Sequence, residues 1–182
     1  MNRIAKQLKE QNIAEYLLYM WQEEDLMRAH HCDMEEIEAD IVSRYPEEQQ
    51  PEMTEWYTNL TAMMREEGVA DHGHLQINKN ILLELTELHQ HLLSSSQYPF
   101  YSAAYFKALP FVAELNSKNP EGGKTELEVC FEAMYGILLL RLQKRTISLG
   151  TEKAMESISS FLSMLANYYS KDCKGELKFN EQ

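Results

Sequence analysis

The chain has 182 residues, of which 44% are hydrophobic and 25% are charged, a composition typical of a globular protein with enough apolar material for a core. Its formal net charge of −12 at pH 7 argues against nucleic acid or an anionic membrane surface as a partner, because both attract basic surfaces. The chain has no run of about 18 apolar residues, so we expect no membrane span.

Cysteine usage and the N-terminal stretch predict the compartment. Cys32, Cys130 and Cys173 share no close spacing, so the sequence predicts neither a disulfide framework nor a zinc knuckle. The opening stretch MNRIAKQLKEQNIAEY alternates charged and apolar residues and lacks the apolar core of a signal peptide. Together these features predict a cytoplasmic protein with reduced thiols.

Negative charge is concentrated in one part of the chain. Between Trp21 and Trp56 there are twelve acidic residues and two basic ones, Arg28 and Arg44, a local net charge of −10. One interpretation, which we favour, is a solvated helical face that keeps the protein in solution. The other is a docking surface for a basic partner.

The first three predicted elements are helices, and alternating β-branched runs are absent from the whole chain. The first helix is predicted from about residue 2 to 30. The second begins behind Asp33 as its N-cap, with a capping-box glutamate three residues later, and stops before residue 46. The third opens near Pro51 and ends at Gly68, because glycine is favoured just beyond a helix C-terminus.

The fourth predicted helix starts behind an N-cap at Asp71 and carries the histidine-rich stretch 71–91. The fifth spans the aromatic-rich segment 98–117. Because Pro110 lacks a backbone donor and crowds the preceding turn, we expect the fifth helix to kink or restart there.

The sixth helix is predicted to begin at Thr125 inside a capping box, and the seventh runs from about residue 151 to 169. The sequence thus predicts an all-α protein, a single-domain helical bundle of about seven helices over residues 1–170. A tail, residues 171–182, is predicted to be poorly ordered. The first and sixth helices are apolar around most of their circumference, so we expect them to be central.

The stretch DHGHLQINKNILLELTELHQH, residues 71–91, raises the question of a metal site. At about 100° per residue, Glu84, Glu87 and His91 share one helical face, but it is the polar face opposite the apolar stripe. A metal centre in a bundle needs ligands turned inward, often in paired Glu-x-x-His motifs, and the chain has none. The sequence therefore predicts no metal and no cofactor.

Polar residues on apolar faces are the remaining site candidates. Glu24 lies in the apolar face of the first helix, one turn before Arg28, and Asn78 and His89 lie at the edge of the fourth helix's apolar stripe. We favour a structural interpretation, an ion pair or a satisfied polar group at a helix crossing. The alternative is a pocket between the first, fourth and fifth helices. That candidate pocket would be lined by Trp21, Glu24, Arg28, His31, Asn78, His89, Tyr101 and Tyr105.

Four strings, NIAEYLLYMWQEEDL, GHLQINKNILLELTELH, PFYSAAYFKALPFVAEL and CFEAMYGILLLRLQK, together resemble a family of bacterial proteins known as a domain of unknown function and found mainly in Bacteroides-type gut bacteria. The similarity extends over nearly the whole chain. It implies a single all-helical domain of about this length, and it assigns no role to any residue.

No serine-hydrolase, phosphate-loop, dinucleotide-binding or paired Cys/His motif is present, so the sequence favours a protein that is not an enzyme. The leading hypothesis is a cytoplasmic protein–protein interaction module able to self-associate, based on the acidic segment, on the expected exposure of Met63 and Met64, and on the aromatic fifth helix. The alternative hypothesis is a small-molecule-binding or metal-dependent bundle that uses the candidate pocket. The acidic charge of the second and third helices excludes a DNA-binding regulator.

Overall fold

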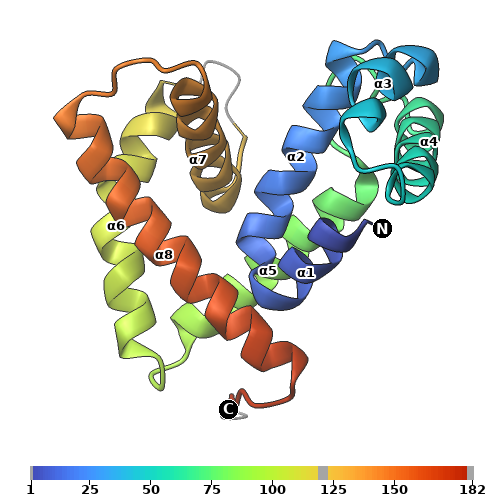
Figure 1. Cartoon of the computed structure of the whole chain (residues 1–182). Coiled ribbons are helices and arrows are strands. Elements are labelled where there is room, and N and C mark those ends of the chain that lie inside the picture. The colour runs from blue at the N-terminus through green and yellow to red at the C-terminus, as the bar shows by residue number, and fades with distance from the viewer. Residues whose placement is uncertain (1, 119–122, 180–182) are drawn as a thin grey trace. The chain divides into compact units, whose positions relative to one another are not determined.

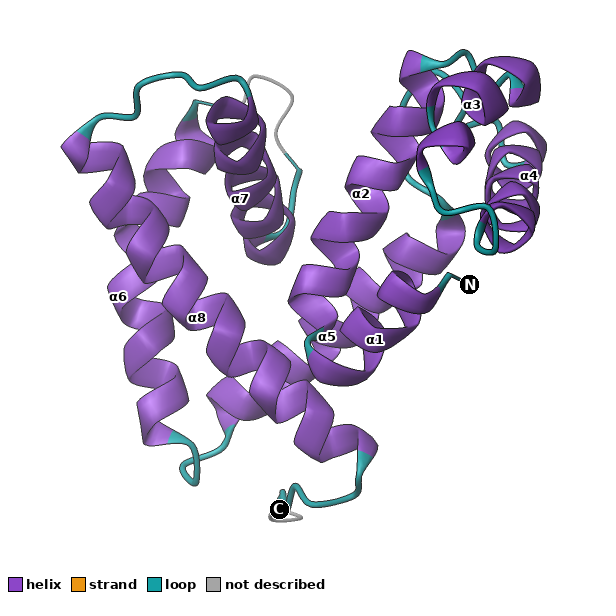
Figure 2. Ribbon diagram, viewed as in Figure 1, coloured by secondary structure: helices purple, strands orange, loops and turns teal. Residues whose placement is uncertain are grey.

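A computed structural model describes residues 2–118 and 123–179 of the chain. Within these residues there are eight α-helices and one short 3-10 helix, and no strand is present (Figures 1 and 2). The prediction of an all-α protein with about seven helices is therefore confirmed. None of the helices in this part of the chain is both long enough and apolar enough to cross a membrane.

The first predicted helix is in fact two helices, α1 (Arg3–Gln11) and α2 (Ile13–Ala29). Asn12 separates them with an extended backbone, and its side-chain oxygen accepts hydrogen bonds from the N–H groups of Ala14 at 3.1 Å and Glu15 at 3.3 Å. An asparagine side chain can compete with helical backbone bonding and cap a new helix. The apolar pattern continues on both sides of Asn12, which is why periodicity did not indicate the break.

The next elements are α3 (Met34–Asp40), the 3-10 helix η1 (Val42–Arg44) and α4 (Gln50–Glu66). Asp33 caps α3 as predicted, because its carboxylate accepts hydrogen bonds from the two N–H groups of the first turn. Beyond α4, Gly68 has a φ of 68°, the left-handed conformation that ends many helices at little steric cost to glycine.

The helix α5 (Gln76–Ser94) starts later than predicted, so the N-cap assigned to Asp71 is wrong. The N–H of Leu75 donates to the carboxylate of Glu24 at 2.9 Å, and the N–H of Gln76 donates to that of Glu67 at 2.6 Å. These acceptors come from distant positions in the chain. A cap is predicted from neighbouring residues, so the sequence indicated Asp71 and not these distant acceptors.

The last three helices are α6 (Pro99–Ser117), α7 (Glu126–Leu142) and α8 (Leu149–Cys173). The helix α6 continues through Pro110 without a restart. The predicted capping box is present at the start of α7, where Thr125 and Glu128 exchange hydrogen bonds. The helix α8 is longer at both ends than the predicted 151–169, and Ser148 caps its first turn.

The chain forms two compact units, Met1–Ile81 and Leu82–Gln182, and the boundary falls within α5. In the first unit α2 is central, with nine of its 17 residues buried. The side chains of Tyr57, Leu60 and Met64 on α4 are also fully buried in this unit. The expected exposure of Met64 is therefore wrong, whereas Met63 is 37% exposed, because the two neighbouring residues point to different sides of α4. The predicted central position of the first helix therefore holds for α2 within its own unit.

In the second unit α6 and α8 lie along one another, and α7 contacts both (Figure 1). Tyr101, Phe131 and Phe161 are fully buried there, one from each helix. The helix α7 is buried mainly in its first half, whereas Leu140 and Leu142 near its end are 37% and 63% exposed. An apolar pattern around the whole helix therefore does not mean that the whole helix is covered.

The predicted single domain over residues 1–170 and the poorly ordered tail over 171–182 stay predictions. Helix α8 continues into the predicted tail as far as Cys173. Beyond it, the backbone carbonyl of Lys178 accepts a hydrogen bond from the hydroxyl of Tyr98 at 2.8 Å. Residues 180–182 of that tail lie outside the described residues.

Candidate functional site

Glu24 is the centre of a buried polar cluster in the first unit, and its side chain has no exposed surface. One carboxylate oxygen accepts hydrogen bonds from the N–H of Leu75 at 2.9 Å and from Nδ2 of Asn78 at 2.7 Å. The other lies 2.6 Å from Nδ1 of His74 and 3.7 Å from the guanidinium of Arg28. Four donors thus surround one carboxylate, which offsets the cost of burying its charge.

The same donors connect α2 to the segment before α5. The guanidinium of Arg28 donates to the backbone carbonyls of Val69, at 3.2 Å, and Gly73, and it pairs with Asp25 at 2.7 Å. The His74 ring stacks on Trp21 with centroids 4.2 Å apart and planes 13° apart. These contacts fasten residues 69–78 to α2.

A second buried carboxylate, Glu23, lies beside the first and was not singled out from the sequence. Burial raises the pKa of Glu23, and hydrogen bonding to Tyr19, Trp56 and Tyr57 opposes part of that rise. The hydroxyl of Tyr19 in turn accepts a hydrogen bond from Nδ2 of Asn2 at 2.9 Å. The sequence does place Tyr19 one helical turn before Glu23, where the two side chains can interact. However, Glu23 belongs to a run of acidic residues, so its pattern is that of an exposed residue.

A cavity of about 380 Å³ opens beside this network. Asn2 and Tyr45 belong to both, because they line the cavity and also interact with Tyr19 and Tyr57. The rest of the cavity wall comes from Arg3, Ile4, Gln7, Gln49, Glu52 and Met53. The cavity lies at the start of α1, and its lining includes none of the residues of the predicted pocket.

His89 forms a separate cluster in the second unit. Its Nδ1 lies 2.6 Å from the hydroxyl of Tyr101, and its ring meets those of Tyr105 and Phe161 edge to face, with centroids 4.9 and 5.4 Å away. Burial lowers the pKa of His89, which favours the neutral imidazole. Nearby, burial raises the pKa of the Cys130 thiol to about 12, so this cysteine is not a nucleophile at neutral pH.

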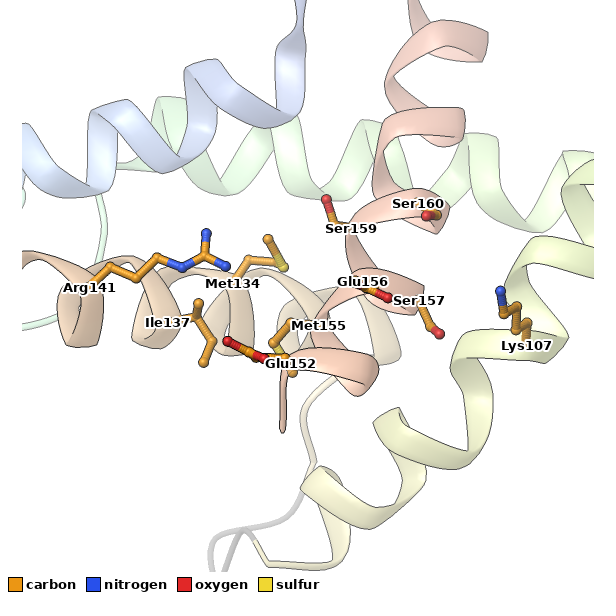
Figure 3. A pocket seen from close by; sticks show the side chains of 10 residues that line it. All are labelled: Lys107, Met134, Ile137, Arg141, Glu152, Met155, Glu156, Ser157, Ser159 and Ser160. Atoms are coloured by element: carbon orange, nitrogen blue, oxygen red, sulfur yellow. The ribbon is translucent and has the colours of Figure 1, made fainter. Parts of the chain in front are cut away.

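The surface of the second unit is hollowed between α6, α7 and α8, as Figure 3 shows, by a groove of about 590 Å³. Lys107 on α6 and Arg141 on α7 line it together with Glu152 and Glu156 on α8. Its apolar lining consists of Met134, Ile137 and Met155. Across residues 2–118 and 123–179, none of the four charged side chains takes part in an ion pair.

Arg141 also belongs to an exposed surface where α7 ends and α8 begins. We define this α7–α8 corner as Leu140, Arg141, Leu142, Lys144, Arg145 and Leu149. Leu142 and Leu149 are 63% and 77% exposed, unusually high values for leucine. Lys144 has a φ of 54°, and the next N–H donates to the carbonyl of Leu140 at 2.9 Å, which closes the end of α7.

The whole chain was compared with known proteins. Residues 2–176 match the family described as "Domain of unknown function (DUF4924)". The chain belongs to this family. No curated protein matches the chain, and no solved structure does. The DUF4924 match extends across both compact units, in agreement with the resemblance predicted over nearly the whole sequence.

In this DUF4924 member the eight residues of the predicted pocket are found in three places. Trp21, Glu24, Arg28 and Asn78 gather in the Glu24 cluster of the first unit. The side chain of His31 is 81% exposed and lies 3.2 Å from Glu36, outside that cluster.

The other three residues, His89, Tyr101 and Tyr105, form the His89 cluster of the second unit. Tyr105 extends it by donating a hydrogen bond to Glu126 at 2.6 Å. His74, which belongs to the histidine-rich stretch 71–91, is the residue that sequence reasoning missed in the Glu24 cluster. The part of the chain that the structure describes holds no group of three or more His, Cys, Asp or Glu side chains arranged to bind a metal.

Proposed function

We propose that this protein is a non-enzymatic protein–protein interaction module that associates with itself. The observation that supports the proposal best is the α7–α8 corner, where exposed leucines alternate with exposed cations. Fully burying one leucine side chain contributes about 1.5–3 kcal/mol, so covering Leu142 and Leu149 is a substantial source of binding free energy. An exposed apolar patch rimmed by polar residues is typical of an interaction site, and none of these cations forms an ion pair within residues 2–118 and 123–179.

The buried polar groups also support the proposal, because they are bonded to one another within the fold. Glu24 is bonded to four donors that fasten the chain, and His89 is bonded to Tyr101 within an aromatic core. Groups held in this way stabilise the fold and are not open to a substrate. The alternative of a ligand pocket lined by both clusters stays a prediction.

The experiment is a concentration series in analytical ultracentrifugation, comparing the native chain with Leu142→Ser/Leu149→Ser. We expect the native chain to associate and the double variant to dissociate at least about tenfold more readily, because the apolar contact is lost. Leu83→Ser is the matched control, since Leu83 is 59% exposed and lies on α5 outside the corner. A native chain that stays monomeric throughout contradicts the proposal.

We further propose a bacterial protein that acts in the cytoplasm. The bacterial origin is supported by the four strings that resemble the family. A reducing compartment is supported by Cys173, an exposed thiol, and by the free thiols of Cys32 and Cys130.

A further inference from the structure

Building on the proposed self-association, we propose that the α7–α8 corner binds the acidic surface of α3, η1 and α4 on a second copy of this chain. The two surfaces are different, so the association runs head to tail. The inference depends on the opposite charges of the two surfaces and on the groove in the acidic one. It also depends on the ion pairs within the described residues, which leave both surfaces charged.

The first surface, which we call the acidic face, lies in the first unit. It consists of Glu35, Glu36, Glu38, Asp40, Glu47, Glu48, Glu52 and Glu55, all of them exposed. Arg44 is the single Lys or Arg between residues 29 and 64, so repulsion within the face is largely uncompensated. A basic surface brought against the acidic face relieves that repulsion.

The acidic face contains a groove of about 600 Å³. Glu38, Glu47 and Glu55 line it, together with the apolar side chains of Val42 and Pro51. A carboxylate rim around an apolar floor suits a leucine side chain that has cations on both sides of it. The groove of the acidic face therefore suits a segment that carries an apolar side chain as well as positive charges.

The α7–α8 corner has the complementary chemistry. Arg141, Lys144 and Arg145 place three positive charges within five residues, and no acidic residue occurs between Glu132 and Glu152. Leu142 lies between Arg141 and Lys144 in the sequence, and it is 63% exposed. A leucine flanked by arginine and lysine is what the groove of the acidic face accommodates.

Both surfaces keep most of their charge within the part of the chain that the structure describes. Among residues 2–118 and 123–179, the ion pairs of the acidic face are those of Glu36 with His31 at 3.2 Å and Asp40 with His30 at 3.8 Å, and none involves Lys or Arg. No ion pair in the same residues involves a cation of the corner. Both surfaces thus keep their charge available for a second copy.

A charge exchange between two variants tests this inference. Variant one carries Arg141→Glu, Lys144→Glu and Arg145→Glu, and variant two carries Glu38→Lys, Glu47→Lys and Glu55→Lys. Each alone should associate about tenfold or more weakly than the native chain, because like charges then meet at the contact. An equimolar mixture should associate again, since each reversed surface finds its opposite on the other variant.

The control for variant one carries Lys79→Glu, Lys174→Glu and Lys178→Glu, which gives the same change in net charge as variant one at exposed positions outside both surfaces. It should associate like the native chain, and circular dichroism checks that every variant keeps its helical content. A mixture that stays monomeric overturns the inference. A third outcome is that the native chain associates, Leu142→Ser/Leu149→Ser weakens the association, and variant two associates like the native chain. In that case the proposed interaction module stands, but the acidic face is not the surface that the corner binds. A native chain that never associates overturns both.

Discussion

Glu24 joins two parts of the first unit through hydrogen bonds to groups that are 50 or more residues away in the sequence. Its partners are the N–H of Leu75, the amide of Asn78, the ring of His74 and the guanidinium of Arg28. The N–H of Leu75 and the amide of Asn78 lose this acceptor when the carboxylate is removed, and unpaired buried donors are costly.

We therefore expect Glu24→Ala to lower the free energy of unfolding by about 3–5 kcal/mol, the range for breaking a buried charge pair. Urea unfolding followed by circular dichroism measures this change. Glu10→Ala, at an exposed position of α1, should change the free energy by no more than about 0.5 kcal/mol. Equal effects of the two substitutions would show that the cluster does not hold the unit together.

His89 makes stability depend on pH in the mildly acidic range. Burial lowers the pKa of His89 below the ordinary histidine value of 6.5, so the unfolded chain binds a proton at a pH where the folded chain does not. The free energy of unfolding should consequently fall as the pH drops from 6.5 toward the folded-state pKa. His89→Gln, which keeps an acceptor for Tyr101, should remove this dependence.

The measurement for His89 is urea unfolding at a series of pH values below neutrality. His72→Gln serves as the control, because His72 is exposed, and that variant should keep the pH dependence of the native chain. An unchanged slope in His89→Gln would assign the pH dependence to another group.

At the scale of elements, local capping groups explain most of the helix boundaries. Asn12 is the clearest case, because its side chain bonds two N–H groups of the first turn of α2 and its own N–H donates to the carbonyl of Leu8 at 2.7 Å. It both ends α1 and starts α2, and α1 then packs against α2.

Replacing this cap should weaken the junction between α1 and α2. We expect Asn12→Ala to lower the free energy of unfolding by about 1 kcal/mol, whereas Asn12→Asp, which keeps a capping oxygen, should cost less. Thermal unfolding of both variants measures the difference. Indistinguishable losses would mean that the side-chain oxygen of Asn12 does not stabilise the start of α2.

At the scale of the whole molecule, charge and exposed apolar surface are distributed unequally between the two units. The acidic face belongs to the first unit and the α7–α8 corner to the second. A net charge of −12 alone indicates repulsion between copies, yet the unequal distribution permits attraction between unlike surfaces. This is why the charge exchange, and not the total charge, is the informative test.

The amino-acid sequence by itself determined the helical class and the helix ends that depend on neighbouring residues, such as the Asp33 cap and the Thr125 capping box. These interactions connect groups within about one helical turn, and a sequence displays them directly. The sequence also placed Glu24, Asn78 and His89 on apolar faces as polar residues that need partners.

Only the tertiary structure decided which partners those residues have. Asn78 bonds Glu24 in the first unit and His89 bonds Tyr101 in the second, so each unit holds its own cluster of these residues. The late start of α5 has the same origin, since its first N–H groups are bonded by Glu24 and Glu67. The physical reason is that a buried polar group must be satisfied by whichever group the packing of helices brings within hydrogen-bond distance, and sequence separation carries no information about that distance.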